Sequence, residues 1–177
     1  MFKIDTNFQT PVVVCDYMVD MVPKNSVKIL EPTPGLGNLV NALHAKNKYQ
    51  VITADDFFLL DKSAKYDCIV MNPPFSSKSA FMKNAPEGVE VTGMKLGYYI
   101  LTECMKMSNN VIALMPWYTI SDSDVRMRFL ESFGIKSLTI LPRKTFKYAR
   151  IQTVIIELEK GYKEETIFRT YPFPELL

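Results

Sequence analysis

The residues best suited to chemistry form one tetrapeptide, Asn72-Pro73-Pro74-Phe75. It directly follows the apolar run 68–71, and a short apolar run that ends in a turn signal is typical of a buried strand. Asparagine brings an amide oxygen that accepts hydrogen bonds, and each proline fixes its φ angle and keeps the preceding residue out of helical geometry. An amide acceptor, a proline carbonyl and an aromatic ring at one rim can hold a flat heterocycle with an exocyclic amine. A plain proline-rich turn is the alternative.

A second feature, upstream of the first, has the layout of a ligand-binding loop. Residues 27–31 form a β-prone run that ends in Glu31, and a loop with Gly35 and Gly37 then enters an apolar helical pattern. Strand, glycine loop and helix in this order cradle cofactors in α/β proteins. Val40 stands where a dinucleotide fingerprint has its third glycine, and the carboxylate of Glu31 would repel a pyrophosphate. An acid here suits a cationic ligand, such as the amino group of S-adenosylmethionine (AdoMet).

The elements that must position these residues alternate between strands and helices. Strands are predicted at residues 27–31, 50–53, 68–71, 111–115, 135–141 and 153–158, and helices at residues 11–21, 38–46, 96–107 and 123–133. This alternation predicts an α/β fold with a mostly parallel sheet, and the last two strands suggest an antiparallel hairpin at one edge. The first helix is predicted to have Thr10 as its N-cap and Pro11 as its first residue. Its buried stripe comprises Val14, Tyr17, Met18 and Met21.

Size and composition predict a single globular domain. The chain has 177 residues, of which 47% are apolar and 23% charged, and its net charge of +2 neither demands nor excludes a nucleic-acid partner. No apolar stretch approaches the roughly 20 residues that span a bilayer, and the N-terminus lacks the layout of a signal peptide. The odd, scattered cysteines Cys15, Cys68 and Cys104 indicate buried thiols in a reducing compartment and no zinc site. We therefore expect a cytoplasmic protein with no metal and no membrane partner.

The motifs and their order resemble those of the amino-methyltransferases of the class I AdoMet-dependent fold, in particular the adenine-N6 DNA methyltransferases. The similarity covers about residues 8–160. Glu31-Pro32-x-x-Gly35-x-Gly37 resembles the family's AdoMet loop, and Asn72-Pro73-Pro74-Phe75 its catalytic [DNS]-P-P-[YFW] motif. The segment Phe8-Gln9-Thr10-Pro11 resembles its N-terminal cofactor-contacting motif. A Thr-Pro helix, then the cofactor loop, then the catalytic motif is the order of the gamma-type enzymes.

This resemblance implies a Rossmann-like class I methyltransferase fold, AdoMet as the cofactor and DNA as a partner. The implied cofactor-binding residues are Thr10, Pro11, Glu31, Pro32, Gly35, Gly37, Asp55, Asp56 and Phe57. The implied catalytic residues are Asn72, Pro73, Pro74 and Phe75. In such a site, the asparagine oxygen and the next carbonyl accept the two hydrogens of the target amine and direct its lone pair at the methyl group, so no thiol nucleophile is needed.

Residues that contact the substrate are implied near the end of the similar region. Phe146 resembles the aromatic residue that packs on the flipped base, although a core aromatic of the hairpin fits the same pattern. Four basic residues surround it, namely Arg143, Lys144, Lys147 and Arg150. Beside a base pocket they suit phosphate contacts and predict salt-sensitive binding, and otherwise they form a solvated face of the hairpin.

The sequence departs from the family's pattern at two places. Such enzymes usually carry two acidic strand ends between the AdoMet loop and the catalytic strand, one for the ribose and one for the adenine of the cofactor. Here one segment, residues 54–58, replaces both, so either a strand–helix unit is missing or Asp55 and Asp56 share the two roles. The residues after Lys160 are too few for a target-recognition domain. We therefore expect a single catalytic domain over residues 1–177, with any specificity arising from loops or a partner subunit.

The favoured function is AdoMet-dependent methylation of the N6 amine of adenine in DNA. One alternative changes the substrate to an adenine in structured RNA or to a glutamine amide of a protein. Protein glutamine methyltransferases usually carry tyrosine where this chain has Phe75, which favours nucleic acid. A second alternative is a non-catalytic DNA-binding subunit with a degenerate methyltransferase fold. The intact Asn72 and Glu31 argue against it, and the shortened cofactor region argues for it.

Overall fold

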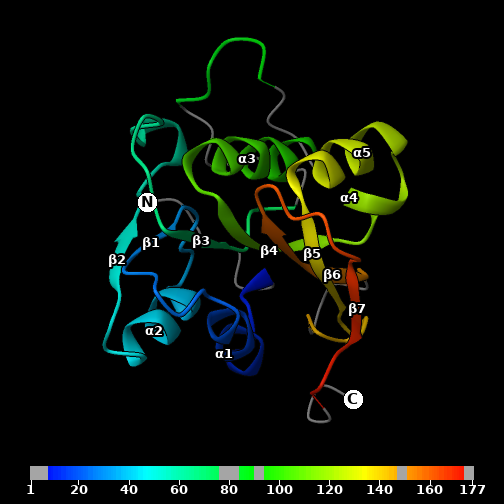
Figure 1. Ribbon diagram of the computed structural model, residues 1–177. Coiled ribbons are helices and arrows are strands. Elements are labelled where there is room, and N and C mark those ends of the chain that lie inside the picture. Colours follow the sequence, from blue (N-terminus) through cyan, green and yellow to red (C-terminus); the bar gives the residue numbers. More distant parts are fainter. Residues whose placement is uncertain (1–7, 76–83, 90–93, 147–150, 174–177) are drawn as a thin grey trace.

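The computed structural model describes residues 8–75, 84–89, 94–146 and 151–173. Within them, one sheet has the strand order β2-β1-β3-β4-β6-β5-β7 (Figure 1). The strands are β1 (Lys28–Glu31), β2 (Gln50–Thr53), β3 (Cys68–Met71), β4 (Asn110–Pro116), β5 (Ile135–Ile140), β6 (Thr153–Glu159) and β7 (Ile167–Thr170). The helices are α1 (Val12–Asp20), α2 (Asn38–Ala45), α3 (Met94–Met107), α4 (Tyr118–Ser121) and α5 (Asp124–Phe133), with a 3-10 turn, η2 (Phe57–Leu59).

The pairing of the strands confirms the predicted α/β fold with a mostly parallel sheet. Strands β1 to β4 run parallel to one another, and β6 runs antiparallel to both β4 and β5. The predicted antiparallel relation of the two late strands is therefore confirmed, but its position at the edge is wrong. Strand β7, which the sequence pattern did not reveal, pairs parallel to β5 and occupies that edge. Its exposed apolar residues, Ile167 and Phe168, lack the in–out alternation that marks a half-buried strand.

Two layers of helices cover the sheet, with α3, α4 and α5 on one face and α1 and α2 on the other (Figure 1). Strand β3 contributes to both cores. Ile69 and Met71 face the first layer, Cys68 and Val70 face the second, and all four are fully buried. Burial on both faces explains why this strand is a continuous apolar run in the sequence. The backbone that carries Asn72 is thus held at the centre of the sheet.

The start of α1 differs from the prediction. The helix begins at Val12, with Pro11 at the N-cap position and no side-chain cap. The Pro11 carbonyl accepts hydrogen bonds from the backbone N–H groups of Val14 and Cys15, at 3.0 and 2.9 Å. Thr10 is therefore not the N-cap, because its side chain is engaged by Asn72 instead. The buried stripe is confirmed, since Val14 and Met18 are fully buried and Tyr17 and Met21 pack against the same core.

Helix α5 has the start and end signals expected from the sequence. The hydroxyl of Ser123 accepts a hydrogen bond from the Arg126 N–H at 3.3 Å. Gly134 follows the helix with φ +130°, and a Cβ there would collide with the Glu159 carbonyl. The short elements α4 and η2 were not predicted, because a single helical turn carries no periodic pattern. In the described part of the chain, no helix has the length and apolar character needed to cross a bilayer.

On the side of β1 away from β3, the described residues contain one strand, β2, which forms the edge of the sheet. Its carboxyl end leads through Asp55 and Asp56 into η2 and then towards β3. The resemblance described above implies a further strand–helix unit at this place. Of the two alternatives, the structure supports the missing strand–helix unit, and this leaves one strand end to serve the cofactor.

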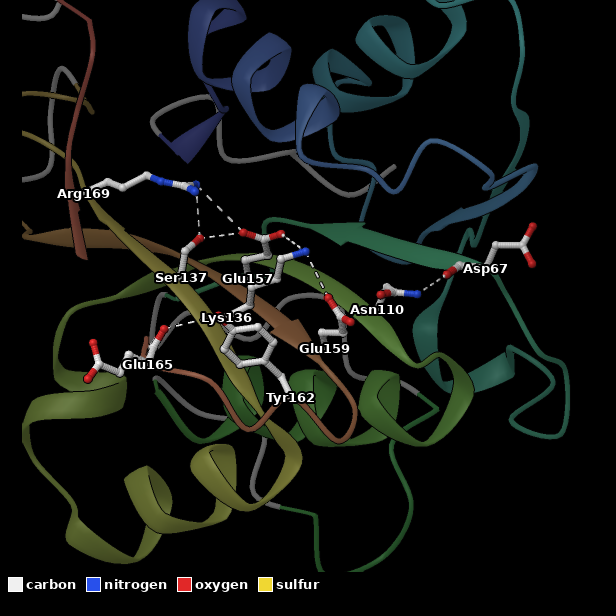
Figure 2. A network of polar contacts seen from close by, with 9 residues as sticks. All are labelled: Asp67, Asn110, Lys136, Ser137, Glu157, Glu159, Tyr162, Glu165 and Arg169. Carbon is white, nitrogen blue, oxygen red and sulfur yellow. Dashed lines mark hydrogen bonds and ion pairs between the residues drawn. The ribbon is translucent and has the colours of Figure 1, made fainter. Parts of the chain in front are cut away.

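The end of the sheet opposite Asn72 carries a polar network (Figure 2). Glu157 accepts a hydrogen bond from the Ser137 hydroxyl at 2.6 Å and pairs with Lys136 at 3.3 Å. Lys136 also pairs with Glu159 at 3.0 Å, and Arg169 on β7 lies 3.9 Å from Glu157. These contacts join β5, β6 and β7, so we assign this network to the stability of the late strands.

Candidate active site

Strands β1 and β3 are parallel neighbours, so their carboxyl ends lie side by side. Glu31 at the end of β1 and the motif 72–75 after β3 therefore lie at the same end of the sheet. Thr33 connects the two motifs. Its backbone N–H donates to Glu31 Oε1 at 2.8 Å, and its hydroxyl lies within hydrogen-bond distance of Glu31 Oε1 (3.2 Å) and of the Asn72 carbonyl (3.3 Å). Thr33 was not singled out from the sequence. Its position two residues after Glu31 would have been the signal, because threonine commonly bonds a nearby loop carboxylate.

The side-chain amide of Asn72 has a defined orientation. Its Nδ2 donates to the carbonyl oxygen of Phe8 at 3.0 Å and to the hydroxyl of Thr10 at 2.9 Å. A backbone carbonyl only accepts, so the nitrogen must face Phe8 and the oxygen must face away. Asn72 Oδ1 is buried and has no hydrogen-bond partner among the residues that the structure describes. An unmet buried acceptor costs about 1–3 kcal/mol, and a ligand N–H that reached this oxygen would offset that cost.

Residues before α1 lie across the glycine loop. Gln9 Oε1 accepts from the Leu36 N–H at 3.0 Å, and the Thr10 carbonyl accepts from Asn38 Nδ2 at 2.8 Å. Gly35 has φ +54°, a conformation that favours glycine, and a Cβ there would lie 2.9 Å from Oε1 at the end of the flexible Gln9 side chain. At Gly37, φ is +88° and a Cβ would meet no atom within 4 Å. The loop thus has open space beside Gly37.

Glu31 is a buried acid with an altered pKa. The residue is 1% exposed, and burial raises its pKa to about 8, against the opposing hydrogen bonds from Thr33. A buried carboxyl group of this kind gains from a cationic partner, because an ammonium group favours the charged form. The acid at the end of β1 and the open space beside Gly37 fit the amino-acid part of AdoMet.

The other residues expected at the cofactor occupy the carboxyl end of β2. Asp56 Oδ1 accepts from the Phe58 N–H at 2.8 Å, and Asp56 Oδ2 accepts from Asn84 Nδ2 at 2.7 Å. Asp55 is exposed. Phe57 is 5% exposed, and the ammonium group of Lys62 lies 3.3 Å from the centre of its ring. The protein therefore engages both oxygens of Asp56, whereas the Asp55 carboxylate faces solvent.

Helix α3 supports the catalytic motif from one side. A Cβ at Gly97 would lie 3.3 Å from the Pro74 carbonyl oxygen and 3.6 Å from Pro73 Cγ. Phe75 is 7% exposed and belongs to the core under α3. Gly97 was missed in the sequence analysis. Its signal was glycine inside a predicted helix, where it costs about 1 kcal/mol relative to alanine and so calls for a packing reason.

Phe146 is linked to Asn72 through Phe8. The two rings are 6.0 Å apart at 47°, and Phe8 is the residue whose carbonyl binds Asn72. Phe146 is 3% exposed and packs in the core beneath α1. Arg143 and Lys144 are exposed, and each interacts with another residue. The other two basic residues of this group, Lys147 and Arg150, lie outside the described residues.

No protein-family model and no curated protein matches the chain. Several solved structures do. A modification subunit assigned to a type I restriction enzyme from Vibrio vulnificus is 16% identical with a TM-score of 0.69, and covers 95% of this chain and 48% of its own. A type I restriction-modification methyltransferase subunit from Streptococcus thermophilus is 18% identical with a TM-score of 0.68, and the match covers 93% of this chain and 47% of that one.

A third structure, assigned to the class I AdoMet-dependent methyltransferases of Listeria monocytogenes, is 16% identical with a TM-score of 0.67. The match covers 98% of this chain and 70% of that one. The present chain spans about half the length of the two restriction-enzyme subunits. At these identities the likeness shows the fold, which is the class I AdoMet-dependent methyltransferase fold.

Proposed function

We propose that this chain is an AdoMet-dependent methyltransferase that acts on the N6 amine of adenine in DNA. The observation that carries the proposal is the amide of Asn72. Phe8 and Thr10 hold its nitrogen, and its buried oxygen has no partner within the described ranges. The target amine has two hydrogens to donate and needs acceptors of this kind. The fold shared with methyltransferase subunits of restriction-modification systems supports the same reading.

The proposed cofactor site combines the glycine loop with the end of β2. Bound AdoMet would supply a methyl group on a sulfonium centre. Glu31 would hold the amino group, with Gly35, Gly37 and Pro32 shaping the loop around the amino-acid part. Thr10 and Pro11 would approach from the segment before α1. Asp55, Asp56 and Phe57 would approach the nucleoside part.

In the proposed reaction, Asn72 Oδ1 and the Pro73 carbonyl accept the two hydrogens of the target amine. This arrangement withdraws the nitrogen lone pair from the ring and points it at the methyl group. The contribution of the protein is orientation and fixed dipoles, effects that are worth several kcal/mol in enzymes. Pro73 and Pro74 keep the backbone carbonyl in place because their φ angles are fixed.

None of the cysteines is needed as a nucleophile, and their chemistry agrees with this. Burial raises the pKa of the Cys15 thiol to about 12, and it also raises the pKa values of Cys68 and Cys104. A thiolate is the reactive form, so these thiols are inert near neutral pH. No general base is required before the attack either, because the methylated ammonium product is itself acidic.

A base in a duplex must leave the base stack to reach Asn72, which costs a few kcal/mol. We propose Phe75 and Phe146, whose rings are buried in the two cores, as the aromatic residues that line the site for the base. Arg143, Lys144, Lys147 and Arg150 are proposed to contact the strand beyond the base. A partner subunit would supply target recognition, and residues 1–177 would form the catalytic domain.

The proposal is tested by methyl transfer from labelled AdoMet to unmethylated DNA, with RNA of the same sequence in parallel and N6-methyladenine identified by mass spectrometry. Asn72→Ala should abolish transfer and leave the AdoMet affinity within about twofold of wild type, because the asparagine acts on the amine and not on the cofactor. Wild-type turnover in Asn72→Ala would refute the assigned role. Transfer to RNA alone would move the substrate to structured RNA.

A second candidate is a non-catalytic DNA-binding subunit. It is favoured by the single strand end at the cofactor side, where β2 alone lies beyond β1 in the described chain. Calorimetry with AdoMet separates the candidates. Binding that Glu31→Gln removes supports the enzyme, and no heat at millimolar AdoMet supports the inert subunit.

A further inference from the structure

Arg126, in the first turn of α5, is a half-buried cation without a counterion among the described residues. Its Nε is buried and has no hydrogen-bond partner in the described part of the chain. The acids nearest in sequence are engaged elsewhere, since Asp124 pairs with Arg128 at 2.9 Å and Asp122 accepts from the Ser121 hydroxyl at 2.8 Å. An arginine that is partly removed from water normally has an anionic partner. The arrangement therefore favours an anion that binds from outside the chain.

Two tyrosines frame this guanidinium. Its central carbon lies 5.7 Å from the centre of the Tyr98 ring. Tyr118 begins α4, which packs against α5, the helix of Arg126. Burial raises the pKa values of Tyr98 and Tyr118, against the opposing charge of Arg126. Both tyrosines are only half-buried. The cluster therefore combines a planar cation with two neutral hydroxyl groups, all of which can donate hydrogen bonds to an anion.

The cluster of Arg126, Tyr98 and Tyr118 lies at the carboxyl end of the parallel strands, as Asn72 does. Tyr98 follows Gly97, where a Cβ would lie 3.3 Å from the Pro74 carbonyl and 3.7 Å from Met115 Cε at the end of β4. Tyr118 begins α4, directly after the carboxyl end of β4. The cluster thus stands beside the catalytic motif, on the face covered by α3, α4 and α5.

We propose that Arg126, with the hydroxyl groups of Tyr98 and Tyr118, binds a backbone phosphate of the nucleic-acid strand that carries the target base. The guanidinium fork matches two phosphate oxygens, and phosphate contacts place a strand without reading its sequence. AdoMet carries a carboxylate, but the glycine loop proposed to hold its amino-acid part lies between β1 and α2, whereas Arg126 lies on α5. A glutamine side chain in a protein has no phosphate. The inference rests on the proposed function in taking the strand as the substrate, and it favours nucleic acid over a protein amide.

The test measures strand binding by fluorescence anisotropy over a series of salt concentrations. The probes are labelled single-stranded DNA, the corresponding duplex and RNA of the same sequence. The variants are Arg126→Met, which removes the charge and the donors, and Arg126→Lys, which keeps the charge and loses the fork. Arg128→Met is the matched control, because Arg128 lies two positions further along the same helix and is exposed. AdoMet affinity is measured for each variant by calorimetry.

Arg126→Met should weaken binding of the preferred strand about tenfold and lower the slope of log affinity against log salt by about one. Arg126→Lys should fall between that variant and wild type, and Arg128→Met should match wild type. AdoMet affinity should stay constant in all three. Thermal unfolding of Arg126→Met should occur at or above the wild-type temperature, because a buried N–H without a partner is removed. If Arg126→Met does not fold, the fall in strand affinity of Arg126→Lys relative to wild type decides the test.

Three results would overturn the inference: wild-type strand binding by Arg126→Met, equal losses in Arg126→Met and Arg128→Met, or no strand binding by the wild-type protein. Displacement of the strand by inorganic phosphate at matched ionic strength would also overturn it and identify free phosphate as the ligand. The outcome is separable from that of the proposed function. Loss of strand binding without any methyl transfer would leave the phosphate site standing and the activity refuted.

Discussion

The hydroxyl oxygen of Thr10 lies 2.9 Å from Nδ2 of Asn72, and this contact helps to decide which way the catalytic amide faces. The carbonyl of Phe8 takes the other hydrogen of the same nitrogen at 3.0 Å. With both hydrogens bound, the amide oxygen has one direction left, away from the segment before α1. Thr10 is itself 4% exposed, so water does not compete for the bond.

Thr10→Val keeps the shape of the side chain and removes the acceptor. We expect kcat to fall about tenfold, which corresponds to about 1.4 kcal/mol, because the amide is held by Phe8 alone. The AdoMet affinity should fall less than kcat, and Thr10→Ser should restore kcat. Thr153→Val is the matched control, since the buried hydroxyl of Thr153 has no hydrogen-bond partner.

The same pair can be tested without any substrate. In a double-mutant cycle on unfolding free energy, Thr10→Val and Asn72→Ala should couple by about 1 kcal/mol, the value of a buried hydrogen bond. Additive effects would show that the two side chains do not interact in solution, even if both variants are inactive.

The affinity for AdoMet should depend on pH through Glu31. In the free protein the pKa of Glu31 is about 8, so the carboxyl group is mostly protonated at neutral pH. Binding of an ammonium group favours the carboxylate and therefore releases a proton. The affinity should rise from about pH 6 towards about pH 8 and then fall as the amino group of AdoMet itself loses its proton. Calorimetry in two buffers of different ionisation enthalpy counts the proton, and a pH-independent affinity would contradict the assignment.

The stability of the free protein should show the opposite trend in pH. The folded-state pKa of Glu31 is raised from 4.5 to about 8, so its contribution to stability is fully present below about pH 4.5 and is lost as the pH rises to about 8. Glu31→Gln keeps the acceptor for the Thr33 N–H and removes this loss. At about pH 8 the variant should be more stable than wild type by on the order of 3 kcal/mol, and at about pH 4 the two should be equal. Thermal unfolding at both pH values checks this, and AdoMet binding should be lost in the variant.

Gly97→Ala should separate stability from catalysis. Alanine favours a helix over glycine by about 1 kcal/mol, which offsets the cost of the tight Cβ contact with the Pro74 carbonyl. We expect an unchanged unfolding temperature and a kcat several-fold below wild type, because a shift of the motif by a few tenths of an ångström displaces the Pro73 carbonyl. Lys106→Ala, on the exposed side of the same helix, is the control. A loss of stability with full activity would show that Gly97 serves packing alone.

The central part of the fold could be predicted because its signals are local. Strand β3 is an apolar run that ends at Asn72, and Glu31 and Gly37 mark a strand, a loop and a helix within a short stretch. The role of Thr10 could not be predicted in this way. A Thr-Pro pair before a helix is also a capping signal, and the partner that overrides it, Asn72, is 62 positions away.

The same limit explains the other residues that the sequence analysis missed. Arg126 looks like an ordinary surface residue of an amphipathic helix, and only its contact with the ring of Tyr98 on α3 shows that it is partly buried. Strand β7 is formed by backbone pairing with β5, and its four residues have no periodic pattern of their own. Long-range partners decide each of these features.

The contacts that orient Asn72 also imply an order of assembly. The bonds that join Thr10 to Asn38 and to Asn72 close loops of 28 and 62 residues, and Phe8 closes one of 64. Such long-range contacts form late, because the entropy of the intervening chain opposes them until the sheet is in place. The catalytic amide therefore acquires its direction only at the end of folding. A partly folded chain would have the sheet and its glycine loop but no oriented acceptor for the amine.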